Sequence, residues 1–151
     1  MFAGEDPERW RWIAVGLVTA LKASAISALS AYETAAQEDV LDPANPGRVA
    51  PLAMLLRRTR SEQYLAPPER LDVPLSHLEA ARRLAAYRNE VVHGADARRP
   101  ATLCVDSLTS LGMIAHFLVK APAFQVAEHG VICALARDEI AALQQQLEAL
   151  G

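Results

Sequence analysis

The chain has 151 residues, the size of one domain, so we expect residues 1–151 to fold as a single helical unit. Hydrophobic residues make up 52% and charged residues 22%, a composition that excludes a disordered or collagen-like chain. The net charge of −3 argues against a protein that coats nucleic acid over its whole surface, although residues 48–99 alone carry a net charge of +4.

The first half of the chain predicts a long helix and a short one. The long helix begins at Asp6, which can cap it, and Pro7, which suits the first helical position. Apolar residues then recur every three or four positions and predict one amphipathic helix that ends near Asp39. A loop rich in proline, asparagine and glycine follows over residues 42–47, and a short helix is expected from Leu52.

The second half predicts three more helices. Ser76 and Glu79 match a capping box at the start of the third helix, which Gly94 can end in the left-handed conformation. A fourth helix is expected within residues 100–122, apolar on more than one side and therefore central, and the last helix follows with a break at Gly130. No strand-like alternation is found. The pattern predicts an all-α fold, an antiparallel bundle of four to five helices.

Cysteine usage and the chain start indicate the compartment. Cys104 and Cys133 are too few and too far apart for a zinc site or a disulfide framework, so we expect both in the core. The N-terminus is acidic where a signal peptide is basic, and the longest apolar run, Ile13 to Leu21, is shorter than the roughly 20 residues that span a bilayer. We expect a cytoplasmic protein with no membrane association, no cofactor and no metal.

The third predicted helix carries the residues that indicate chemistry. On a helical wheel at about 100° per residue, Arg88 falls in the middle of the apolar face, while Asn89 and His93 lie on its edge. An unpaired buried charge is costly, so the arginine needs an explanation. It can pair with a carboxylate such as Glu33 or Asp106, reach past its neighbours to water, or bind an anion such as phosphate in a cleft or subunit interface.

His93 has two interpretations of its own. Just before Gly94, at a helix C-terminus, it can cap free carbonyls and complement the helix dipole. The same position favours the imidazolium, which can bind or protonate a phosphate oxygen. Arg88 and His93 would lie about 140° apart on a continuous helix, so one site can use both only if the helix frays or a partner contributes.

The run Arg-Asn-Glu-Val-Val-His at residues 88–93 resembles the signature of the HEPN superfamily (higher eukaryote and prokaryote nucleotide-binding domains), whose antiparallel helical bundles carry it late in the third helix. The helix order agrees over residues 7–120. The resemblance implies metal-independent RNA cleavage at a two-fold cleft of a homodimer, leaving a 2′,3′-cyclic phosphate. In that reaction His93 would activate the 2′-hydroxyl or protonate the leaving oxygen, and Arg88 would stabilise the phosphorane. Asn89 would orient the histidine or a phosphate oxygen.

The resemblance also implies biological partners. An enzyme of this kind would be the toxin of a toxin–antitoxin pair or part of a phage-defence system, with an antitoxin protein as partner. The basic cluster Arg57, Arg58 and Arg60 would guide RNA towards the cleft. The alternative is a non-catalytic HEPN-like module that dimerises or binds a nucleotide or a partner protein, with Arg88 held in a buried ion pair.

Overall fold

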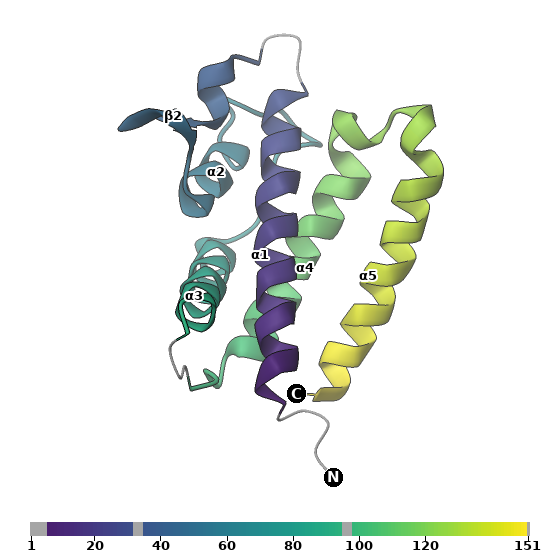
Figure 1. Ribbon diagram of the computed structural model, residues 1–151. Coiled ribbons are helices and arrows are strands. Elements are labelled where there is room, and N and C mark those ends of the chain that lie inside the picture. The colour runs from purple at the N-terminus through teal and green to yellow at the C-terminus, as the bar shows by residue number, and fades with distance from the viewer. Residues whose placement is uncertain (1–5, 32–34, 95–97, 151) are drawn as a thin grey trace.

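The computed structural model describes residues 6–31, 35–94 and 98–150, and it is 71% helical, which confirms the predicted all-α class. Figure 1 shows its α-helices, which are Pro7–Ser30 (α1), Leu52–Thr59 (α2), Leu75–Val92 (α3), Leu103–Lys120 (α4) and Gly130–Leu150 (α5). Short 3-10 helices lie between them, at Gln37–Val40 (η1), Pro122–Phe124 (η2) and Ala127–His129 (η3).

The first helix begins where the sequence predicts and ends earlier. The carboxylate of Asp6 accepts a hydrogen bond from the amide of Glu8 at 3.0 Å and caps α1. The predicted end near Asp39 is wrong, because α1 ends at Ser30. Further on, the Asp39 carboxylate accepts a hydrogen bond from the amide of Ala36 at 2.9 Å within η1. Such a side-chain bond to the backbone competes with helical hydrogen bonding and favours a turn.

A small sheet replaces the predicted loop before α2. Leu41–Asp42 (β1) and Asn45–Val49 (β2) pair antiparallel, with Leu41 opposite Val49. The lack of strand-like alternation in the sequence therefore does not exclude this short pair of strands. β2 is exposed along its whole length, so it lacks the alternation of buried and exposed residues by which a strand is recognised from sequence.

The third helix does not begin with the predicted capping box. Leu75 is its first residue, Pro74 stands at the capping position in extended conformation, and no side chain caps the helix. Ser76 therefore lies inside the first turn, two positions beyond the capping residue. Glu79 forms an ion pair with Arg82 instead, at 2.8 Å.

The central helix is α4, as its apolar pattern predicts. It packs against α1, α3 and α5 (Figure 1). Its Met113 and Phe117 are almost fully buried. Cys104 and Cys133 are both buried and unbridged, as expected from the sequence. The Cys104 thiol donates to the carbonyl of Leu147 at 3.0 Å, which ties the start of α4 to the end of α5.

Two helices in the described part of the chain are long and apolar enough to cross a membrane. Their windows within Glu8–Ser30 and Leu103–Lys120 have mean hydropathies of 1.7 and 1.3. The nine-residue run from Ile13 to Leu21 therefore underestimates the length of the apolar stretch in α1, since small and apolar residues continue past Lys22. Core helices pass the same test, and 44% and 56% of the two windows are buried in this fold. The expected lack of membrane association stays a prediction.

Candidate functional site

Arg88 lies half-buried in the second half of α3. The core-facing residues Leu84, Tyr87 and Val91 are buried and fix the rotation of this helix about its axis. Burial also raises the pKa of the Tyr87 phenol above its ordinary value, which keeps the side chain neutral. The Nε atom of Arg88 is buried and has no hydrogen-bond partner among the residues that the structure describes. Leaving such a donor unpaired costs about 1–3 kcal/mol, so an acceptor that reaches this atom would remove that cost.

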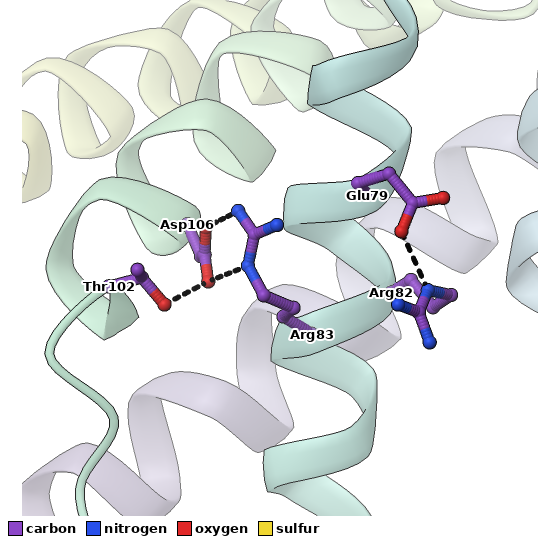
Figure 2. A network of polar contacts seen from close by, with 5 residues as sticks. All are labelled: Glu79, Arg82, Arg83, Thr102 and Asp106. Carbon is purple, nitrogen blue, oxygen red and sulfur yellow. Dashed lines mark hydrogen bonds and ion pairs between the residues drawn. The ribbon is translucent and has the colours of Figure 1, made fainter.

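The carboxylate expected for Arg88 is used by another arginine. Asp106 is 2% exposed and accepts hydrogen bonds from Nη2 and Nε of Arg83 at 2.6 and 3.0 Å, and from the Thr102 hydroxyl at 2.9 Å (Figure 2). The hypothesis that Asp106 pairs with Arg88 is therefore wrong. Arg83 faces α4, whereas Arg88 lies about 140° further round the helix. Glu33, the other candidate, lies outside the described residues.

The pair of Arg83 and Asp106 was not predicted from the sequence. Arg83 falls on the polar side of its helix, where the sequence pattern indicates a plain surface charge. The hydrogen bond to Asp106 raises the pKa of Arg83 above its ordinary value. The available signal was Asp106 itself, since a carboxylate within an apolar central helix needs a cation.

Arg88 and Asn89 line a pocket of about 360 Å³ between α1, α2 and α3. Two further cations, Lys22 of α1 and Arg82 of α3, line the same pocket. The other lining residues are apolar, namely Val18, Pro51, Leu52, Ala53, Leu56, Ala81, Ala85 and Ala86. The described lining holds no aspartate or glutamate, so the pocket is locally positive in a chain of net charge −3.

Sequence reasoning missed Lys22 and Arg82 as members of this site. The signal for Lys22 was its interruption of the longest apolar run in the chain. Periodicity along α1 does not reveal which helix stands opposite the lysine. In Figure 2, Arg82 and Arg83 point to opposite sides of α3, so these two neighbouring arginines contact different partners.

His93 lies outside the pocket that Arg88 and Asn89 line. It ends α3 as the capping residue, with its amide donating to the carbonyl of Asn89 at 3.1 Å. Gly94 follows with φ +76°, the left-handed conformation that the sequence predicts. The imidazole is exposed, and nothing in the described part of the chain forms a hydrogen bond with it. Within one chain, the histidine is therefore not among the residues that line the pocket, although Asn89, one turn before it, is.

The basic cluster on α2 has mainly structural contacts. Nη1 of Arg58 donates to two backbone carbonyl oxygens of the segment after α1, at 2.8 and 2.9 Å. Nε of Arg60 donates to the carbonyl of Val73 at 2.9 Å. Arg57 is exposed and has no hydrogen bond or ion pair with the described residues. None of these arginines lines the pocket, and RNA contact by the cluster stays a prediction.

A larger cavity of about 870 Å³ lies between α1, α4 and α5. This trough is mainly apolar, and Trp12, 65% exposed, lies on it. Small residues of α1 line one side, including Gly16, Ala20 and Ala23. None of the predicted site residues reaches the trough.

Comparison with protein-family models, with curated proteins and with solved structures finds no match. Within residues 6–31, 35–94 and 98–150, no group of three or more His, Cys, Asp and Glu side chains is placed to hold a metal ion. The geometry of α3 and the motif that it carries are therefore the features that indicate a function.

Proposed function

We propose that the protein is a metal-independent endoribonuclease of the HEPN type that acts as a homodimer. One observation carries the proposal: Arg88 lines a positively charged pocket with a buried Nε that the described chain leaves unpaired. A phosphate group matches this arrangement, because guanidinium groups bind phosphate oxygens through charge-assisted hydrogen bonds. RNA presents such a group at every nucleotide.

The proposed reaction is transfer of the phosphoryl group within the RNA strand. The 2′-oxygen attacks the adjacent phosphorus, the bond to the 5′-oxygen of the next nucleotide breaks, and the products carry a 2′,3′-cyclic phosphate and a 5′-hydroxyl. His93 takes the proton from the 2′-hydroxyl or delivers one to the departing oxygen. Arg88 stabilises the charge on the phosphorane, and Asn89 orients the histidine or a phosphate oxygen.

The position of His93 outside the pocket that Arg88 lines supports a site shared between two chains. His93 is exposed at the end of α3, so a second copy can present its histidine to the pocket of the first. A two-fold axis between the copies would create two equivalent sites. The resemblance of the motif adds the biological setting: a cytoplasmic toxin or phage-defence nuclease that an antitoxin protein restrains.

The test is cleavage of total RNA and transfer RNA in EDTA by the wild type, His93→Ala and His129→Ala. His129 is an exposed histidine outside the pocket and serves as the matched control. We expect the wild type and the control to leave cyclic-phosphate ends, and His93→Ala to lose at least about 100-fold in rate. Equal cleavage by folded wild type and His93→Ala overturns the proposed role of this histidine.

The apolar trough favours a second candidate function. A non-catalytic HEPN-like module that dimerises or binds a partner would use such a surface, on which Trp12 is largely exposed. The buried ion pair expected for this alternative has no carboxylate among the described residues. A folded wild type that cleaves no RNA but forms dimers or binds a nucleotide would support this function.

A further inference from the structure

We propose that the pocket between α1, α2 and α3 binds the phosphate group of a nucleotide, with Lys22 and Arg82 as contacts beside Arg88. This inference adds contact residues to the site of the proposed function. It rests on that function only for the statement that the bound nucleotide belongs to an RNA strand. Phosphate binding itself requires no cleavage, because His93 does not line the pocket. Binding and cleavage are therefore separable by mutation.

The charge of the lining is the first argument. Its cations come from two helices, and its described members include no acid that would neutralise them. Lys22 has no ion pair or hydrogen bond with the residues described in the structure. Nε of Arg82 bonds to Glu79 at 2.8 Å, but this pair lies in solvent, with the arginine side chain 64% exposed. A surface pair of this kind is weak, and Arg82 keeps its terminal nitrogens for a ligand.

The second argument is the open donor on Arg88. Its Nε is buried, and no described residue offers it an acceptor. Phosphate oxygens accept such hydrogen bonds, often two from one guanidinium. Asn89, one residue further on, also lines the pocket, and its side-chain amide is a hydrogen-bond donor.

The third argument is the start of α2. Pro51 precedes this eight-residue helix, and no side chain caps it. Leu52 and Ala53 form its first turn and line the pocket. Amides in the first turn of a helix have no acceptor within the helix and carry partial positive charge, which favours an anion. A helix start and side-chain cations therefore meet at one pocket.

The size of the pocket limits the ligand. A volume of about 360 Å³ lies near the lower end of the roughly 300–1,000 Å³ that ligand pockets span. Apolar residues such as Val18, Leu56 and Ala85 make up the rest of the lining and suit a sugar or base. The pocket thus fits one nucleotide, whether free or as part of an RNA strand.

Titration calorimetry with inorganic phosphate and AMP, and fluorescence anisotropy with a short 2′-O-methyl RNA, test the inference. The 2′-O-methyl strand cannot be cleaved by attack of its own 2′-oxygen. We expect Lys22→Met, Arg82→Met and Arg88→Met each to weaken binding about tenfold, the loss of one charge-assisted contact. Arg137→Met, an exposed arginine on α5, is the matched control and should bind like the wild type.

Each outcome has a defined meaning. Binding of AMP that needs these cations assigns the pocket to free nucleotides, and binding of the RNA alone assigns it to a strand; both support the inference. No binding of any probe, or equal affinity of the wild type and the three variants, overturns it. Because Arg82 is exposed, Arg82→Met gives a folded variant even where another substitution unfolds the chain. Binding retained in His93→Ala, with no cleavage by the wild type, would overturn only the proposed nuclease.

Discussion

Arg83 and Arg88 lie five residues apart on α3 and have opposite electrostatic surroundings. Arg83 neutralises a buried carboxylate on α4, whereas Arg88 has a donor that no described residue pairs, beside other cations. The same residue type therefore stabilises the fold at one position and is available for a ligand at the other. A helical wheel cannot make this distinction, because it gives the angle of a residue on its own helix and not the element that stands opposite.

The first prediction compares the stability of two variants. Arg83→Met should lower the free energy of unfolding by about 2 kcal/mol, because Asp106 is left buried with only the Thr102 hydroxyl. Arg88→Met should instead raise it by about 1 kcal/mol, because no described partner is lost and the cost of a buried unpaired donor is removed. Urea denaturation followed by circular dichroism measures both. An equal loss in Arg88→Met would show that this arginine has a structural partner.

The second prediction concerns the basic cluster on α2. Arg58→Met removes two hydrogen bonds to backbone carbonyls and should lower the free energy of unfolding by about 2 kcal/mol. Arg57→Met, the exposed neighbour, should leave stability unchanged. Thermal unfolding of the two variants checks the difference. If Arg57→Met weakens RNA binding at full stability, the predicted guidance of RNA by this cluster gains support.

At the scale of elements, the sequence predicts helix boundaries best where a residue type favours one backbone conformation. Asp6 before a proline, Gly94 after a helix and Pro122 at the end of α4 all mark boundaries correctly, because these residues restrict the backbone itself. The predictions failed for the end of α1, the capping box and the small sheet. There, a local side-chain bond or the backbone of a preceding proline decides between conformations of similar energy.

The third prediction concerns uneven protection along α5. Its first turns leave Val131, Ile132 and Leu135 exposed, at 74%, 66% and 60%, while Leu147 near its end is fully buried. Amide hydrogens near Gly130 should therefore exchange faster than those around Leu147, since helices open where few apolar contacts hold them. Hydrogen exchange with mass spectrometry resolves the two ends. Equally strong protection at both ends would mean that another surface covers the first turns in solution.

At the scale of the whole molecule, the candidate site was only partly predictable. The motif on α3 could be read from one stretch of sequence, and the structure places Arg88 and Asn89 on a pocket. The pocket also needs Lys22 from a helix about sixty residues earlier in the chain and the start of α2. Such long-range proximity depends on packing between helices, which the periodicity of a single sequence does not encode.

The fourth prediction tests whether the site is shared between chains. Arg88→Ala and His93→Ala should each be inactive alone, and a mixture that exchanges subunits should regain activity. A mixed dimer has one site with both residues intact and one with neither, so an equimolar mixture should reach about a quarter of the wild-type rate. RNA cleavage after mixing and incubation measures this recovery. A mixture that stays inactive although the chains exchange would show that both residues act from the same chain.

The outward position of His93 at the end of α3 has a consequence for dosage. If the reacting groups meet only when two chains associate, the rate per chain depends on how much protein is present. At protein concentrations below the dissociation constant of the dimer, most chains are inactive monomers. Total activity then rises with the square of the protein concentration. A restraining protein would then need only to keep chains apart, without covering any reacting atom. Low-level synthesis of such a chain would be harmless as long as its concentration stays below the dissociation constant of the dimer.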